Sequence, residues 1–404
     1  MKRFISFLLV LVLIVGLFSN ISYATNIDKK NFNTITTDSI TKVDVDNLLS
    51  FGFTVKATGD KVEIAKKDVK FEFNKNSNEV SVNGVQFKTV GKTEVKNNKV
   101  YIPFRFFFET MNYEVVWNNG KTSVKKLNEP KYPVDYTNDG KKYLVSKEPS
   151  KIVSLAPDVT ETIFRLGAGN KIIGRTKYCD YPAEAKKVKE VGTMYEPNIE
   201  TVVSLKPDLI IAATHYKEDV IKKFQAAKIP TLVKDSPNRV EEAYKDILVI
   251  GNIVNKNYEA RALASTMREK VNYVSMLTKS KFKPSVYFVV GTGDGGEFTH
   301  GDNTFVNDII ITAGGVNSAK DAEGYKYNVE KLIKNNPDYI FGGSWAKDIM
   351  TKSSNYSSLK AIKNNKFIVI DENVYNRPSE RLVTDGLKAI LKTIHPELMY
   401  KINF

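Results

Sequence analysis

The chain has 404 residues, of which 42% are hydrophobic and 26% charged, a composition typical of folded globular domains, with room for about two to three of them. Its formal net charge is +14, but the lysines are scattered singly and in pairs rather than clustered with aromatic residues, so we expect no nucleic-acid partner. Cys179 is the single cysteine, which excludes an intramolecular disulfide, and we interpret it as a small buried residue.

The first residues (1–24) have the pattern of a secretory signal peptide. Lys2 and Arg3 precede an apolar run from Phe4 to Phe18, and small residues up to Ala24 form a cleavage site. The alternative is an uncleaved anchor helix, but the run is shorter than the roughly 20 residues that span a bilayer. No cysteine for lipid attachment lies near Ala24. We therefore expect a secreted, extracytoplasmic protein at the cell surface, where its diffuse positive charge suits an anionic cell wall or membrane.

Residues 26–127 have the pattern of a small α+β domain. Strand-like alternations occupy 62–73 and 78–87, and a helical patch lies within 99–111. A weak repeat at an offset of 60 residues pairs FTVKATGDKVEI (53–64) with YEVVWNNGKTSV (113–124). Each copy is a strand, an Asn/Gly/Asp turn and a returning strand, which predicts two hairpins.

The segment ending NNKVYIPFRFFFETMNYEVVWNNGKTSVKK closely resembles the small domain named after the N-terminus of copper amine oxidases. That domain occurs as a repeat in secreted proteins of Gram-positive bacteria, so the resemblance implies such a source. No His or Cys lies between residues 25 and 127, so we expect neither a copper site nor oxidase chemistry. A spacer, or a contact with the wall or a partner, is the expected role.

Residues 128–148 contain two prolines and many polar residues, and they predict a linker with one edge strand. From Lys151 the chain alternates strands and helices, which predicts a parallel sheet covered on both faces and a first lobe over 149–237. The expected strands begin at KIVSLA (151–156), IIGRT (172–176), DLIIAA (208–213) and TLVK (231–234).

One segment of this lobe recurs 130 residues later. NIETVVSLKPDLIIAA (198–213) matches NVEKLIKNNPDYIFGG (328–343), with Asn, Glu, Pro, Asp and Ile at the same places. Each copy predicts a helix cap, a short amphipathic helix, a Pro-Asp break and a buried parallel strand. One α/β unit used twice indicates two similar lobes that face each other across a cleft.

The stretch from Val240 to Leu277 is helical in pattern throughout and lies between the two copies. It predicts a rigid connecting helix over 238–280, followed by a second lobe over 281–404. The predicted fold class is therefore α/β, with two similar lobes built on parallel sheets, joined by one long rigid helix and preceded by a small α+β domain.

The chain from Lys151 to the C-terminus resembles the ABC-transporter binding proteins that handle cobalamin, haem and iron–siderophore complexes, and most closely the vitamin B12-binding members. The resemblance implies lobes that close only slightly, a non-catalytic role, and delivery of the captured ligand to an ABC permease. Four motifs carry it: KIVSLAPDVTETIFRLG (151–167), the segment from YCDYP to DLII (178–211), FTHGDNTFVNDIIITAGGVN (298–317) and NRPSERL (376–382).

The resemblance gives the repeated glutamates a role. In the family, one surface acid on each lobe pairs with arginines of the permease, and Glu200 and Glu330 occupy those motif positions. Carboxylates on matching faces would steer and register a docking surface. The alternative is local, because a Glu two residues after an Asn cap is favoured by the helix dipole.

Ligand contacts are expected from loops at the strand ends that line the cleft. Tyr178 matches a family position that contacts the corrin ring, whereas Met194 stands where a B12-binding member has Trp. That departure keeps haem open, because Met can ligate iron, although Thr193 stands where some relatives carry the tyrosine that ligates haem. The full set of expected ligand contacts is Tyr178, Met194, Tyr195, His300, Tyr325, Trp345 and Arg377.

Several sequence patterns point away from other functions. The Gly-rich run 291–296 fits the dinucleotide pattern, but no helix start follows it to hold a pyrophosphate. His215, His300 and His395 have no metal-ligand spacing, and no nucleophile elbow or His-Glu-x-x-His motif is present. We therefore expect neither an enzyme nor a bound cofactor. A non-catalytic wall-binding or adhesion protein is the alternative to a solute receptor.

Overall fold

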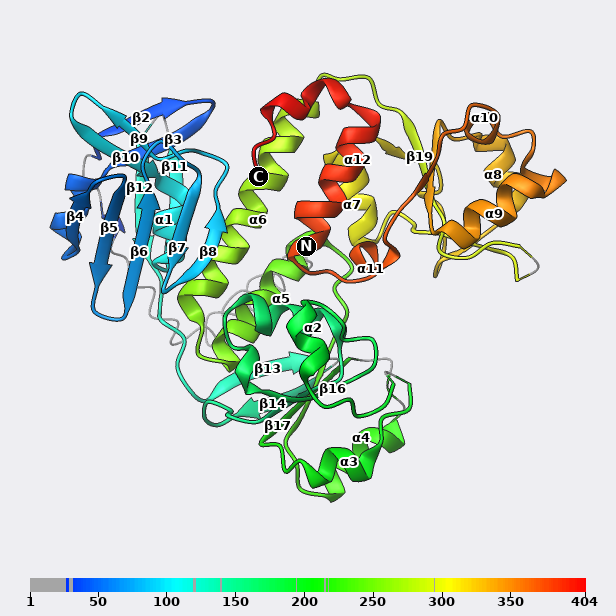
Figure 1. The fold of residues 1–404 in the computed structure, drawn as a ribbon, viewed down its shortest axis with the longest axis horizontal. Helices are drawn as coiled ribbons and strands as arrows, with labels where there is room; N and C mark the ends of the chain where they lie inside the picture. The colour runs from blue at the N-terminus through cyan, green and yellow to red at the C-terminus, as the bar shows by residue number, and fades with distance from the viewer. Residues whose placement is uncertain are drawn as a thin grey trace, which may run out of the picture.

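Helix α6 (Asn257–Thr278) runs through the middle of the computed structural model. The N-terminal domain lies on one side of it and the parallel sheet of the second lobe on the other (Figure 1). The structure describes residues 27–28, 32–118, 121–138, 140–193, 195–213, 216, 218–293 and 295–404. The predicted signal peptide, His215 and Met194 lie outside these residues. No helix within the described ranges is long and apolar enough to cross a membrane.

The N-terminal domain is built from antiparallel sheets around one phenylalanine-rich helix, α1 (Phe104–Thr110). Phe104, Phe106, Phe107 and Phe108 are all buried, so this short helix fills the space between the sheets. The strands are β1 (Ile27–Asp28), β2 (Thr34–Thr37), β3 (Ile40–Asp44), β4 (Thr54–Thr58), β5 (Lys61–Lys66), β6 (Val69–Asn74), β7 (Glu79–Val82), β8 (Val85–Lys88), β9 (Glu94–Lys96), β10 (Lys99–Pro103), β11 (Tyr113–Asn118) and β12 (Lys121–Lys126).

The weak repeat in this domain corresponds to two hairpins, as predicted. Strands β4 and β5 pair antiparallel from Thr54↔Ala65 to Thr58↔Lys61, and β11 and β12 pair from Tyr113↔Lys126 to Asn118↔Lys121. The first hairpin belongs to a five-stranded sheet and the second to a three-stranded sheet.

The predicted linker contains more structure than the sequence indicated. Instead of one edge strand it forms a hairpin of β13 (Val134–Asn138) and β14 (Lys141–Val145). Long-range hydrogen bonds hold the hairpin and the chain just before it: the Tyr132 hydroxyl donates to the Ile253 carbonyl at 2.7 Å, and Asn138 Nδ2 in β13 donates to the Val233 carbonyl at 2.8 Å. These tertiary contacts order a segment whose polar composition alone suggested a loop.

The two predicted lobes are present and have the same topology. The first sheet has the parallel order β16-β15-β17-β18 and the second has β21-β19-β23-β24. In both, the first strand in sequence lies between the second and third, and the fourth is at the edge. The strands are β15 (Ile152–Ser154), β16 (Ile172–Arg175), β17 (Leu209–Ala213), β18 (Thr231–Lys234), β19 (Ser285–Phe288), β21 (Val316–Asn317), β23 (Tyr339–Gly342) and β24 (Phe367–Val369), with a separate pair β20 (Glu297–Phe298) and β22 (Lys326–Tyr327).

The sequence repeat has the same local geometry in each lobe. Asn198 caps α3 (Ile199–Ser204) by accepting from the Thr201 N–H at 2.8 Å, and Asn328 caps α8 (Val329–Asn335) by accepting from the Lys331 N–H at 3.0 Å. The Asp of each Pro-Asp break then ties two strands together. The Asp208 carboxylate accepts from the Ser150 N–H at 2.9 Å, and the Asp338 carboxylate accepts from the Ser285 N–H at 2.7 Å.

The long helical stretch is two helices rather than one. Helix α5 (Val240–Ile253) is followed by Val254 as its C-cap, Asn255 takes a left-handed φ of 57°, and α6 begins at Asn257. The two helices pack closely, because a Cβ built on Gly251 would lie 2.2 Å from the Ala260 Cβ. Helix α6 is therefore the connecting helix. The remaining helices are α2 (Pro157–Arg165), α4 (Glu218–Ala226), α7 (Phe305–Thr312), α9 (Ser344–Lys352), α10 (Lys360–Lys363), α11 (Glu372–Tyr375) and α12 (Leu387–Ile394).

Candidate functional site

The carboxyl ends of the strands in the two lobes face each other. The loop after β16 carries Tyr178, and its carbonyl accepts from Arg377, which follows β24 and α11 in the second lobe, at 2.9 Å. The loop after β18 carries Arg239, which donates to the Asp302 carbonyl of the second lobe at 3.0 Å. In open α/β sheets ligands bind outside the carboxyl ends of the strands. The region between these two contacts is therefore the candidate site.

Four aromatic side chains from this region are 39–63% exposed: Tyr178, Tyr195, Tyr325 and Trp345. Tyr178 and Tyr195 belong to the first lobe and lie on adjoining loops, since the Lys177 N–H donates to the Gly192 carbonyl at 2.8 Å. Tyr325 lies in the turn directly before β22, and Trp345 is in the first turn of α9, directly after β23. Each lobe thus carries two large exposed rings.

Tyr325 is held in a strained backbone conformation. Its φ is 69°, which a residue with a side chain rarely adopts, and the preceding Gly324 is also left-handed. The Tyr325 carbonyl accepts from the Thr299 N–H at 2.8 Å, and its ring packs edge-on against His300 with centroids 5.3 Å apart. Such strain is found mainly where the surroundings keep a side chain in place for function.

His300 lies behind this tyrosine rather than at the surface. It is 4% exposed, and burial lowers the pKa of its imidazole to about 4, so the ring is neutral at physiological pH. Its Nδ1 atom has no hydrogen-bond partner among the described residues.

Trp345 is oriented by a carboxylate. Its indole N–H donates to both oxygens of Glu372, at 3.0 and 3.1 Å. The neighbouring Gly343 leaves room for this pair, because a Cβ there would lie 2.4 Å from a Glu372 oxygen and 2.6 Å from the indole nitrogen. A larger residue at position 343 would displace the tryptophan.

Arg377 was also predicted as a ligand contact, but its side chain is buried. It is 6% exposed, and its guanidinium donates to Glu161 at 2.9 Å, to Asp180 at 2.8 Å, to the Tyr178 carbonyl and to Asn373. Glu161 and Asp180 belong to the first lobe, so this arginine ties the lobes together. In this structure its donors are committed to the protein.

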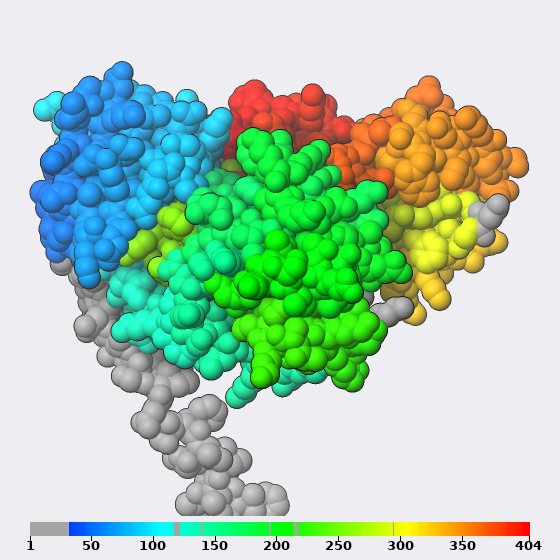
Figure 2. All heavy atoms as spheres, turned by 60° about the horizontal axis from the view of Figure 1, so that its bottom comes forward, coloured from blue at the N-terminus to red at the C-terminus, as the bar shows by residue number. Residues whose placement is uncertain are grey.

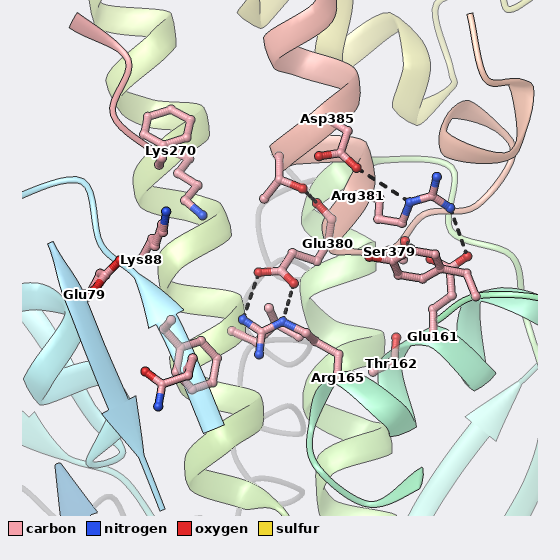
Figure 3. A pocket seen from close by; sticks show the side chains of 16 residues that line it. Glu79, Lys88, Glu161, Thr162, Arg165, Lys270, Ser379, Glu380, Arg381 and Asp385 are labelled. Carbon is pink, nitrogen blue, oxygen red and sulfur yellow. Dashed lines mark hydrogen bonds and ion pairs between the residues drawn. The ribbon is translucent and has the colours of Figure 1, made fainter. Parts of the chain in front are cut away.

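More ion pairs extend this tie. Ser379 Oγ donates to the second Glu161 oxygen at 2.7 Å, and Arg165 of α2 forms a two-pronged pair with Glu380 (Figure 3). Glu161 and Asp180 were not among the site residues predicted from the sequence. A signal was present in both cases: Glu161 is an acid inside the apolar helix TETIF, and Asp180 stands two residues after Tyr178.

Glu200 and Glu330 are exposed in the first turns of α3 and α8, the two copies of the repeat. Within the described part of the chain neither makes a hydrogen bond or an ion pair, although a lysine (Lys331) directly follows Glu330.

The structure also describes the Gly-rich run and the candidate metal ligands that the sequence analysis considered. The Gly-rich run leads into strand β20 rather than into a helix, so no helix N-terminus is present there to hold a pyrophosphate. Among the residues that the structure describes, no cluster of three or more His, Cys, Asp or Glu could hold a metal ion. Cys179 is buried, as predicted.

Two families match separate parts of the chain. The Periplasmic binding protein family matches residues 152–374, which is more than half of the chain. The Copper amine oxidase N-terminal domain matches residues 31–126, which confirms the second resemblance.

Individual relatives agree with the first match. An ABC transporter substrate-binding lipoprotein of Bacillus subtilis, YvrC, is 32% identical over 260 residues, 63% of this chain and 82% of the relative. A cobalamin-binding protein of Halobacterium salinarum is 24% identical over 59% of this chain and 68% of its own length. A solved structure from Staphylococcus epidermidis, described as a possible iron-binding (periplasmic solute-binding) protein, superposes with a TM-score of 0.55 at 26% identity, over 62% of this chain and all of that one.

Proposed function

Because the chain belongs to the periplasmic binding protein family, we propose that it is the extracytoplasmic substrate-binding protein of an ABC importer and captures a corrinoid or an iron chelate between its lobes. Proteins of this family are transport components and not enzymes. The observation that carries the proposal is the set of four exposed rings, two from each lobe, together with the contacts that bring the loops after β16 and β18 against the second lobe.

The chemistry of these rings favours a large, flat ligand. Tyrosine and tryptophan present apolar faces that stack on a conjugated macrocycle, while the hydroxyl and indole N–H keep polar contacts at the ring edge. A corrin or a porphyrin has such a face, and a siderophore with aromatic iron-binding groups has smaller ones. The cobalamin-binding relative and the iron-binding structural neighbour support this range of ligands.

A titration of the mature protein tests the proposal. Cyanocobalamin, haemin and a ferric siderophore are added separately, and binding is followed by absorbance and calorimetry. We expect one of them to bind at micromolar concentration or below. Tyr178→Ala and Trp345→Ala should each weaken that ligand by about tenfold, or ~1.4 kcal/mol.

Tyr400→Ala is the matched control, because Tyr400 is 82% exposed in the C-terminal segment, on a different surface. It should leave the affinity unchanged. If none of the three ligands binds at micromolar concentration, the corrinoid or iron-chelate assignment is wrong.

The same proposal assigns Glu200 and Glu330 to the permease contact. They are exposed, occupy equivalent positions in the two lobes, and have no partner within the described residues. Two carboxylates so placed would pair with cationic side chains of the permease and set its register on the receptor.

Charge reversal separates docking from ligand capture. The double variant Glu200→Lys and Glu330→Lys should abolish uptake of the ligand by cells that carry the permease, while its affinity for the ligand stays unchanged. Glu114→Lys with Glu397→Lys makes the same change in net charge at exposed positions elsewhere and should keep uptake. A loss of ligand affinity in the first variant would place the two glutamates in the cleft and end the docking assignment.

A further inference from the structure

A pocket lies where the N-terminal domain meets the connecting helix and the start of the C-terminal helix, and its lining includes Glu161 and Ser379 from the tie between the lobes (Figure 3). Its volume is about 560 Å³, which is in the range of small-molecule sites. Strand β8, helices α2 and α6, and the chain after Ser379 form its walls. Apolar and aromatic side chains supply part of the lining: Phe87, Tyr181, Leu263 and Phe404.

Lys270 of α6 points into this pocket (Figure 3). Its relative exposure is only 2%, and it makes no hydrogen bond or ion pair within the described residues. Its ammonium nitrogen lies 5.4 Å from the centroid of the Phe404 ring. A buried cation without an anionic partner is costly, because the protein interior does not replace the water that it has lost.

The carboxylates around the pocket are already engaged elsewhere. Glu380 is paired with Arg165, and Asp385 lies 3.6 Å from Arg381. Glu161 accepts from Arg377 and Ser379.

At the rim of the pocket, Glu79 lies directly across the β7–β8 pair from Lys88 and accepts from Asn74 at 3.3 Å. Lys270 is therefore a buried cation left without a carboxylate of its own, in a pocket with room for a guest.

We propose that this pocket binds a small organic anion, a carboxylate or phosphate on an aromatic or apolar body, with Lys270 contacting the anionic group. The rings of Phe87, Tyr181 and Phe404 would cover the body of the ligand. This pocket shares no aromatic residue with the proposed ligand site between the lobes. Anion binding here can therefore be tested independently of the importer's substrate.

The charge state of Lys270 supports this assignment. Burial lowers its pKa to about 8; among its charged neighbours, Glu380 and Glu269 act to raise the pKa, and Arg165 and Lys88 act to lower it. An anion bound at Lys270 would favour the charged form and raise the pKa again. Binding should therefore be strongest below pH 8 and weaken as the pH rises through that value.

The test compares probes that differ in charge or in the presence of an aromatic body. Benzoate, phenyl phosphate and neutral benzamide are titrated into the mature full-length protein by calorimetry, with inorganic phosphate as a probe without an aromatic body. We expect benzoate or phenyl phosphate to bind at millimolar concentration or below, and benzamide and inorganic phosphate to bind at least about tenfold more weakly. Failure of both aromatic anions to bind would overturn the proposal.

Variants locate the binding. Lys270→Met should weaken the better aromatic anion by at least about tenfold and remove its dependence on pH, and it should fold, because it replaces an unpaired buried charge with an apolar side chain. If the methionine variant proves unstable, Lys270→Arg takes its place in the test. It keeps the charge and should retain binding. Lys279→Met, at an exposed position just after α6, is the control and should bind as the wild type does. Equal binding by the methionine variant and the wild type would place the anion elsewhere and refute the assignment.

Discussion

Like Arg165 and Arg239, Arg377 joins the two lobes. It lies in the second lobe, yet its buried guanidinium contacts Glu161 and Asp180 of the first. A buried ion pair contributes little net stability by comparison with an apolar pair of the same shape, but loss of one partner leaves the other charge buried and unpaired. The pair therefore acts chiefly to fix how the lobes sit against each other.

Arg377→Met should lower the free energy of unfolding by up to about 3–5 kcal/mol, because it removes the cation that is hydrogen-bonded to the buried Glu161 carboxylate and leaves only Arg381, at 3.6 Å. The double variant Arg377→Met with Glu161→Gln should recover part of that loss, since no buried charge remains unpaired. Urea unfolding of the four proteins, including the wild type and the single Glu161→Gln variant, measures the coupling. Strictly additive effects would show that the two side chains do not act as a pair.

At the scale of elements, the repeated unit was the part that could be predicted best. Its Asn cap and the Asp of its Pro-Asp break bond to backbone N–H groups, so the same residues give the same local structure in both lobes. The break between α5 and α6 could not be predicted, because Asn255 turns the chain without a Gly or Pro and the turn is stabilised by packing of Gly251 against Ala260.

The site shows the same limit. Exposed rings such as Tyr178 and Trp345 could be proposed from loop position and resemblance, and they remain predictions as ligand contacts. The partners of Arg377 could not be found by pattern, because Glu161 lies 216 residues away in sequence and is brought to it only by the fold. The 134–145 hairpin was missed for the same reason, since its hydrogen bonds reach α5 and β18.

At the scale of the whole molecule, the N-terminal domain is fixed to the connecting helix. Arg261 of α6 donates to the Thr110 carbonyl at 2.8 Å, and Arg268 contacts Glu109 at 3.3 Å. Both views place this domain and the sheet of the second lobe on opposite sides of the molecule (Figure 1 and Figure 2). The domain thus packs against the helix that joins the lobes, on the side away from that sheet.

One acid at this interface should make the docking depend on pH. Glu269 of α6 is buried, and one of its oxygens has no hydrogen-bond partner among the described residues. Burial, followed by the nearby Glu109, raises the pKa of its carboxyl from 4.5 to about 8, against the opposing effect of Arg105 and Lys270. Between pH 4.5 and 8, the folded protein therefore keeps a proton on Glu269 that the unfolded chain has already released. By linkage, the stability from this group is complete below pH 4.5 and is lost as the pH rises through 8.

Glu269→Gln removes this ionisation and should stabilise the protein more at pH 8 than at pH 5, by on the order of 2 kcal/mol in the free energy of unfolding. Other groups titrate over the same range, so the measured quantity is the difference between variant and wild type at each pH, from denaturant unfolding followed by circular dichroism. Glu114→Gln, at an exposed position of the same domain, is the control and should show no such change with pH. A difference between Glu269→Gln and wild type that stays constant from pH 5 to pH 8 would mean that Glu269 ionises normally at the interface. The domain would then be docked by its arginine contacts alone, with no sensitivity to pH from this acid.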